Sequence, residues 1–206
     1  MIGKMRVLIG CERFGVLRDA FLALGHDAYS CDVVPTEAPG PHIQGDVREA
    51  MVTGWDLFIV HPDCTFLTVA NTYLKRGCSK YTPTEALALQ QVAIDFFLCV
   101  AEAPVARVCV ENPIGVMSRR WRKPDQIVQP WQFGDDASKA TCLWLRGLPL
   151  LQHTTVLPGG PKARRANQTS SGQNRLGPSP QRAMLRAKTY PGIAAAMALQ
   201  WGGSTA

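Results

Sequence analysis

Short apolar runs of strand type alternate with segments of helical periodicity along most of this sequence. The strand-type runs are residues 5–10, 26–34, 55–60, 106–112 and 140–145, and the helical segments are residues 15–25, 82–103 and 192–201. The first helix is expected to stop at Gly25, and the second to start after Pro83 with Thr84 as its N-cap. This alternation predicts an α/β fold, with a mostly parallel sheet and helices on both of its faces.

The composition fits one globular core with a single long excursion. Of the 206 residues, 46% are hydrophobic and 18% are charged. Residues 1–151 are expected to form the core, and residues 189–206 a C-terminal helix that returns to it. Between them, residues 152–188 are rich in Gly, Pro, Ser, Asn and Arg and have almost no apolar periodicity. We expect a basic, loop-rich insertion there, and long loops in compact domains are usually functional or disordered.

The cysteines and histidines do not suggest a disulfide framework or a metal site. The seven cysteines include no Cys-x-x-Cys pair, so we expect reduced thiols in a cytoplasmic protein. Neither they nor the four histidines have metal-ligand spacing, so no metal is expected. We also expect no membrane span, and "MIGKMRVLIG" is typical of a first strand rather than a signal peptide.

Charge is distributed very unevenly along the chain. Residues 1–136 contain all 16 acidic residues and 13 Lys and Arg, for a charge of −3, whereas residues 137–206 contain nine Lys and Arg and no acid, for +9. This asymmetry favours a nucleic acid or another polyanion as partner. The alternative is a basic tail that only improves solvation.

Four candidate motifs follow strand-type runs, and ligands of open α/β sheets bind beyond the carboxyl ends of the strands. The motifs are "GCERFG" after the first run, Asp32 after the second, "HPDC" after residues 55–60 and "ENP" after residues 106–112. Each has a structural explanation of its own: Gly15 in a turn, Asp32 as a strand end, Glu111 as a helix cap. All four in this order favour a functional site.

This order resembles the DNA cytosine-5 methyltransferase family, and in particular the short members found in bacteriophage and prophage genomes. "VLIGCERFGVLRDAFLALGHDAYSCD" is similar to the family's cofactor loop and second strand, and "GDV" at 45–47 to its adenine-reading motif. "DLFIVHPDCTFL" is similar to the nucleophile motif, normally Pro-Pro-Cys, and "VENP" to the Glu-Asn motif. "QPWQFGDDASKATCLWLRGLPLL" and "RAKTYPGIAAAMALQWG" resemble the closing segments of the short phage members. The resemblance covers nearly the whole chain and implies a Rossmann-like class I S-adenosylmethionine-dependent methyltransferase fold, in the host cytoplasm if the chain is phage-encoded.

The resemblance implies covalent catalysis on cytosine. Cys64 would add to carbon 6 of the ring so that carbon 5 attacks the methyl donor. Pro62 would fix the backbone at the strand end, Glu111 would meet ring nitrogen 3 and the exocyclic amine, and Asn112 would hold the loop. A duplex base must be flipped out for this chemistry. The sequence does not identify the base that removes the carbon 5 proton; ordered water is one candidate.

The resemblance also implies S-adenosylmethionine as cofactor. Gly15 would lie in its loop, Asp32 would accept hydrogen bonds from the ribose hydroxyls, and Asp46 matches the adenine-reading position. The chain departs from the family where "CER" replaces glycines and where Asp63 replaces the second proline. A carboxylate at position 63 should raise the pKa of the neighbouring thiol.

The expected DNA contacts are basic. The family's closing motif has arginines where this chain has Lys139 and Thr141, and the insertion stands in place of a target-recognition domain. The expected phosphate-binding residues are Lys139, Arg164, Arg165, Arg175, Arg182, Arg186 and Lys188, with Lys162 also in the insertion. Trp121 and Trp131 either stack on bases or pack in the core.

The sequence therefore predicts an S-adenosylmethionine-dependent DNA cytosine-5 methyltransferase of minimal size. One alternative is a related pyrimidine-modifying enzyme with another substrate or cofactor. Another is a methyltransferase-like module that has lost catalysis and binds DNA or a protein, which Asp63 and the glycine-poor loop favour. Amino-group methylation ranks lowest, because "HPDCT" lacks the aromatic residue that this chemistry uses.

Overall fold

The computed structural model describes residues 3–69, 80–177, 179 and 181–203. Within these residues, seven strands form one sheet in the order β3-β2-β1-β4-β5-β7-β6. The strands are β1 (Arg6–Gly10), β2 (Asp27–Asp32), β3 (His42–Gln44), β4 (Leu57–Val60), β5 (Val108–Pro113), β6 (Gln126–Val128) and β7 (Thr141–Arg146). β7 is antiparallel to both of its neighbours, and the other pairs are parallel. The expected Rossmann-like α/β fold, with a mostly parallel sheet, is confirmed.

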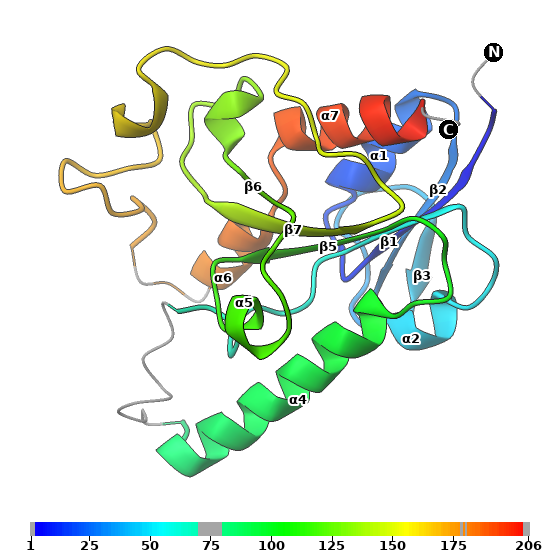
Figure 1. Ribbon diagram of the computed structural model, residues 1–206, viewed down its shortest axis with the longest axis horizontal. Coiled ribbons are helices and arrows are strands. Elements are labelled where there is room, and N and C mark those ends of the chain that lie inside the picture. The colour runs from blue at the N-terminus through cyan, green and yellow to red at the C-terminus, as the bar shows by residue number, and fades with distance from the viewer. Residues whose placement is uncertain (1–2, 70–79, 178, 180, 204–206) are drawn as a thin grey trace.

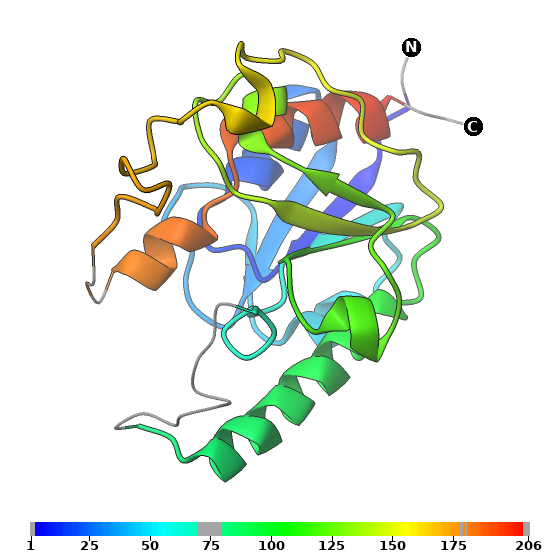
Figure 2. The same cartoon turned by 60° about the vertical axis from the view of Figure 1, so that its left-hand side comes forward.

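Helices cover both faces of this sheet (Figures 1 and 2). α1 (Val16–Ala23) and α7 (Pro191–Gly202) lie on one face, and α2 (Val47–Ala50) and α4 (Pro83–Ala101) on the other. Side chains alternate along each strand, so in β4 Leu57 and Ile59 enter the core under α1 and α7, while Phe58 and Val60 enter the opposite core. All four are fully buried, and burial of such a side chain contributes roughly 1.5–3 kcal/mol. A strand buried on both faces is apolar without interruption, as this one is.

The long helix α4 begins at a different cap from the one expected. Thr82, not Thr84, is the N-cap: its hydroxyl accepts from the backbone N–H of Glu85, and the Glu85 carboxylate accepts from the backbone N–H of Thr82. Pro83 occupies the first helical position, where its missing N–H costs no hydrogen bond. The "TPTE" sequence is thus a reciprocal capping box.

By length and composition alone, α4 is long and apolar enough to cross a membrane, with a mean hydropathy of 1.4 over its best 18-residue window. The expectation that no segment reaches this length was therefore wrong. Part of the apolarity has a local reason, because Ile94, Phe97 and Val100 pack into the core beneath the sheet. Leu87 and Val92 instead remain exposed.

The basic insertion is mostly loop in its described residues, with a short 3-10 turn (Gly160–Lys162) and one short helix, α6 (Arg182–Ala187). It is docked on the core by polar contacts. Asn167 bonds to both the N–H and the carbonyl of Ser138, at 2.9 and 3.0 Å. The N–H of Leu157 donates to the carbonyl of Trp131. These contacts bring the insertion to the edge where β7 begins (Figure 2).

Candidate active site

Four strand ends place one residue each in a row along the carboxyl edge of the sheet. Gly10 pairs with Cys31 on one side and Val60 on the other, and Val60 pairs with Val110. One residue further along each strand come Asp32, Cys11, His61 and Glu111, side by side in that order. We call these four residues the site row. The sequence had singled out the two ends of this row, but not Cys11 or His61.

The loop after β4 is locked to the loop after β5. Pro62 is buried, and its carbonyl accepts a 2.7 Å hydrogen bond from the Asn112 side chain. Cys64 follows, and its carbonyl accepts from the N–H groups of Leu67 and Thr68, both at 3.0 Å. Gly115 approaches this turn so closely that a Cβ there would collide with the Leu67 carbonyl. Asn112 therefore links the two loops, and its part in catalysis stays a prediction.

Cys64 is half-buried and its thiol is held protonated at neutral pH. Burial raises the pKa of Cys64 above its usual value, the negative charges of Asp63 and Glu111 raise it further, and Lys139 opposes them. Asp63 is exposed, and its Oδ1 accepts from the N–H and the hydroxyl of Thr65, at 3.0 and 2.7 Å. The expected effect of Asp63 on the thiol is confirmed in direction, and burial is the larger cause.

Glu111 is the centre of a polar cluster. Its Oε2 lies 2.9 Å from Nδ1 of His61, and the Glu111 and His61 side chains are only 15% and 12% exposed. Burial raises the pKa of Glu111, but the charge of Lys139 and the hydrogen bonds from His61 and Thr141 outweigh it and lower the pKa to about 2. Glu111 is therefore a carboxylate at any physiological pH. Lys139 and Thr141 reach it because antiparallel β7 begins at this edge, with Thr141 paired to Pro113.

A cavity of about 140 Å³ lies on the other side of His61. Its polar lining comes from the site row and the loop after β1: Cys11, Glu12, Arg13, Asp32 and His61, with Phe14 beside them and Met184, Ala187 and Thr189 covering it. A narrower cleft, of about 10 Å³, is lined by Glu111, Lys139 and Thr141. His61 and Thr189 line both spaces. Cys64 is outside both of these linings.

The Glu12 carboxylate binds backbone N–H groups at the start of α1. It is buried, and its two oxygens accept from the N–H groups of Leu17 and Arg18, at 2.7 and 3.3 Å, at the start of α1. Cys11 before it adopts a left-handed backbone, φ 56°, a conformation that costs of order 1 kcal/mol outside glycine. The sequence offered no signal for this role, because "CER" matched nothing in the resemblance.

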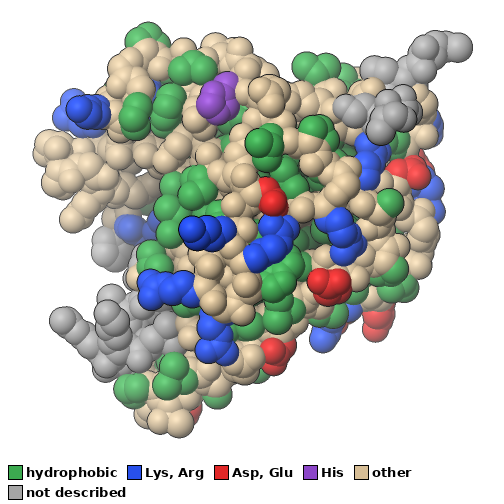
Figure 3. Space-filling view, viewed as in Figure 1, with side chains coloured by type: hydrophobic (Ala, Val, Ile, Leu, Met, Phe, Trp, Pro, Cys, Tyr) green, Lys and Arg blue, Asp and Glu red, His purple; other side chains and the backbone are tan. Residues whose placement is uncertain are grey.

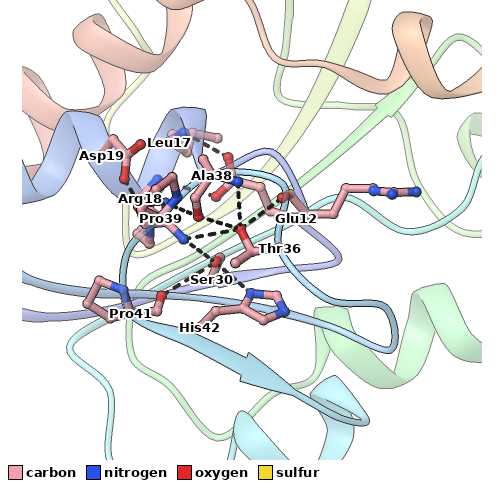
Figure 4. Close-up of polar contacts among 11 residues, drawn as sticks. Glu12, Leu17, Arg18, Asp19, Ser30, Thr36, Ala38, Pro39, Pro41 and His42 are labelled. Atoms are coloured by element: carbon pink, nitrogen blue, oxygen red, sulfur yellow. Dashed lines mark hydrogen bonds and ion pairs between the residues drawn. The ribbon is translucent and has the colours of Figure 1, made fainter.

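Arg18 holds the segment of residues 36–39, which hydrogen-bonds to the carbonyl of the cavity-lining Arg13 (Figure 4). It is fully buried and donates to the hydroxyls of Ser30 and Thr36 and to the carbonyls of Ala38 and Pro39. Gly15 must be glycine, because its φ is 71° and a Cβ there would strike the Arg18 guanidinium. Gly15 is not among the residues that line the cavity, so its cofactor-binding role stays a prediction.

The Asp46 carboxylate caps a helix and forms an ion pair with Arg48. It caps α2, accepting from the N–H of Arg48 at 2.9 Å, and pairs with the Arg48 guanidinium. It is not among the residues that line the cavity beside Asp32. Its adenine-reading role stays a prediction.

The basic residues of the insertion separate into two kinds. Arg164, Arg175, Arg186 and Lys188 are exposed and Arg182 is half-buried. The expected phosphate contact of Arg165 is not supported, because this side chain is only 5% exposed. It donates to the Gly160 carbonyl at 2.8 Å, lies over the Trp131 ring and faces Asp136. The Lys139 ammonium also has partners within the protein: its charge lowers the pKa of Glu111, and it donates to the Lys188 carbonyl.

A second group of basic residues was not singled out from the sequence. Lys and Arg side chains gather over α5 (Met117–Arg120) and the chain that follows it (Figure 3). Arg119, Arg120 and Lys123 are exposed there, next to the loop that carries Cys64. Trp121 packs edge-on against Phe97 and borders the core, which favours the packing role for this residue.

No protein-family profile matches the sequence, and neither does any curated protein. Among solved structures, the chain is similar to a DNA modification methyltransferase encoded within an E. coli prophage, with a TM-score of 0.47 and 13% identity over 80% of this chain and 57% of that one. It is also similar to the Dnmt2 methyltransferase of S. pombe, with a TM-score of 0.45 and 13% identity over 72% of this chain and 51% of that one. The chain thus spans little more than half of either protein.

Proposed function

We propose that this protein is an S-adenosylmethionine-dependent cytosine-5 methyltransferase acting on DNA through a covalent adduct at Cys64. The observation that carries the proposal is the Asn112–Pro62 hydrogen bond. It ties the loop of a half-buried cysteine to the strand of an ionised glutamate, so that two motifs 47 positions apart in the sequence are held close together. Thiol and carboxylate are the two groups that nucleophilic addition to a cytosine ring requires.

The side chains present suit the expected roles. The Glu111 carboxylate accepts a hydrogen bond from the exocyclic amine of the base. Lys139 lowers the pKa of both Glu111 and Cys64, so its charge favours the thiolate over the thiol. Thiolate formation is needed only in the step that attacks carbon 6, and a thiol held protonated until then is protected from other electrophiles.

The cavity beside His61 fits the chemistry of the cofactor but not its full size. Asp32 would accept from ribose hydroxyls, and the Glu12 carboxylate would face the ammonium of the methionine part. The cofactor supplies the methyl group. Sites for ligands of this size occupy about 300 Å³ or more, against about 140 Å³ here. α6, whose Met184 and Ala187 cover the cavity, must therefore move aside for binding.

DNA as substrate is supported by the exposed basic residues on α6 and α5, on either side of the site row. These residues suit contacts to phosphates, which position a strand without reading its sequence. The family resemblance adds to this support. We therefore expect weak sequence preference.

Mass spectrometry of nucleosides tests the proposal. DNA incubated with the protein and S-adenosylmethionine should yield 5-methylcytosine, and Cys64→Ala should abolish it while retaining the fold and cofactor binding. Cys99→Ala is the matched control, because Cys99 is an exposed cysteine on α4. Methylation by Cys64→Ala, or an unmodified cytosine pool with the parent protein, would contradict the proposal.

One observation favours the module without catalysis. The pKa of Cys64 is raised by burial and two carboxylates, as in an inert buried thiol. In that case the parent protein would bind DNA and leave every cytosine unmodified, so the same experiment separates the two functions.

A further inference from the structure

His61 occupies the position between the two halves of the site. In the site row it stands between Cys11, on the cavity side, and Glu111. It is one of two residues that line both the cavity and the Glu111 cleft. A group in this position lies where a methyl donor in the cavity and a base held by Glu111 would meet.

The hydrogen bond to Glu111 determines the proton arrangement of the imidazole. An ionised carboxylate has no proton to give, so Nδ1 of His61 must be the donor across the 2.9 Å contact. In the neutral ring Nε2 then carries a lone pair. This atom is buried and has no hydrogen-bond partner among the residues that the structure describes. A carboxylate that orients an imidazole and leaves its other nitrogen open is an arrangement suited to a general base.

The other carboxylates of the site each accept at least one hydrogen bond within the protein. Glu12 accepts from two N–H groups of α1, Asp32 accepts from the N–H of Val34, and Asp63 accepts from Thr65. Glu111 itself is engaged by His61, Lys139 and Thr141. Nε2 of His61 differs from them, because it is buried and has no hydrogen-bond partner among the described residues.

We propose that His61 is the general base that removes the proton from carbon 5 of the methylated adduct, an inference that rests on the proposed function. After methyl transfer, the ring carries the methyl group and one hydrogen on carbon 5 and the Cys64 sulfur on carbon 6. The C5–H bond breaks and its proton moves to Nε2. The electron pair forms the C5=C6 double bond, the C6–S bond breaks, and its electrons return to sulfur as thiolate. The imidazolium, stabilised by Glu111, then loses its proton to solvent.

His61→Asn tests this role with a readout other than product yield. The amide nitrogen of Asn can still donate toward Glu111, but the side chain has no basic atom. On ordinary cytosine DNA with S-adenosylmethionine, the variant should accumulate a denaturation-resistant protein–DNA adduct, visible on a denaturing gel. Release of 5-methylcytosine should fall about 100-fold, the lower range for loss of a general base. His153→Asn is the control, because His153 is exposed and lies away from the site row.

DNA containing 5-fluorocytosine separates this inference from the proposed function. Fluorine replaces the hydrogen that His61 would remove, so parent and His61→Asn should both be trapped as adducts, at similar rates. Trapping of the variant also shows that it is folded. If the variant is not trapped while the parent is, or if it turns over cytosine DNA at the parental rate, His61 is not the base. If the parent itself is never trapped, the covalent mechanism fails and this inference falls with it.

Discussion

Replacing Lys139 with methionine should lower the free energy of unfolding at neutral pH, and this difference from the parent should disappear in acid. Lys139 is the largest of the interactions that hold the Glu111 carboxylate ionised against its burial. Methionine keeps most of the length of the side chain and removes the charge. The pKa of Glu111 should then rise from about 2 toward its ordinary value of 4.5.

The size of the effect follows from the shift in the pKa of Glu111. The drop from 4.5 to about 2 corresponds to roughly 3 kcal/mol, at 1.36 kcal/mol for each pKa unit. Lys139, His61 and Thr141 share this stabilisation, and we expect about 1–2 kcal/mol to depend on Lys139. A lowered carboxylate pKa stabilises the fold above the unfolded-state pKa. The contribution should be complete above about pH 5 and disappear as the pH falls through 2.

Urea unfolding of four proteins measures this contribution: the parent, Lys139→Met, Glu111→Gln and the double variant, at pH 7, 5, 3.5 and 2.5. The double-mutant cycle removes the effects of each substitution on other neighbours, including the contact of Lys139 with the Lys188 carbonyl. We expect a coupling of about 1–2 kcal/mol at pH 7 that declines toward zero in acid. A coupling near zero at pH 7, or one that persists unchanged at pH 2.5, would refute the reasoning.

The same variant decides whether Lys139 also contacts DNA. A lysine that neutralises one phosphate contributes about 0.9 to the slope of log affinity against log salt concentration. Because its charge is directed at Glu111, we expect Lys139→Met to leave this slope unchanged. A slope shallower by nearly one unit would restore the phosphate contact expected from the sequence.

Three further predictions follow from the contacts described. Asp63→Asn keeps an acceptor for Thr65 but removes a charge that raises the pKa of Cys64. Iodoacetamide should therefore alkylate Cys64 about twofold to fivefold faster at pH 7.5. An unchanged rate would show that the charge of Asp63 does not contribute to this pKa. Arg164→Ala should reduce the slope of log DNA affinity against log salt concentration by about 0.9. Arg165→Ala should leave this slope unchanged and destabilise the fold by about 1–3 kcal/mol, because Arg165 is buried against Trp131 and Gly160. Equal slopes for the two variants would count against this division. Arg18→Met should lower the free energy of unfolding in urea by about 3 kcal/mol. It should also increase amide hydrogen exchange in residues 33–41, because the carbonyls of Ala38 and Pro39 lose their donor. Exchange protection equal to that of the parent would contradict the role given to Arg18.

Sequence periodicity predicted the elements with a clear apolar pattern and missed several short ones, for a physical reason. α4 has 19 residues, and the four residues of β4 are all apolar, so both patterns can be recognised in the sequence. β3, β6, α2 and α5 have only three or four residues each, about one helical turn or at most two strand repeats, which is too short for a periodic pattern to be recognised. Such elements form because the surrounding sheet and helices hold them, not because of local propensity. α6 was missed for the same reason, and with it the residues that cover the cavity.

Residue types alone could not separate Arg164 from Arg165, two adjacent arginines in a basic segment. Their roles differ because the loop at Gly160 and the ring of Trp131 receive only the second guanidinium. Lys139 had a similar ambiguity. A cation 28 positions after Glu111 looks like a surface charge until the antiparallel direction of β7 is known, since that direction brings the start of the strand, and not its end, to the carboxyl edge.

The position of His61 beside Glu111 can be predicted from the sequence. Adjacent parallel strands end at the same edge, so residues that directly follow them are candidates for contact even when they are 50 positions apart. The histidine that opens "HPDC" follows the strand "LFIV" as directly as Glu111 follows "VCV". The registers Gly10–Val60 and Val60–Val110 then make the pairing of His61 with Glu111 a consequence of the sheet rather than of the loop. A pairing fixed by strand register keeps its geometry when the neighbouring loops and α6 move, and this constancy is what a base that acts between two bound reactants requires.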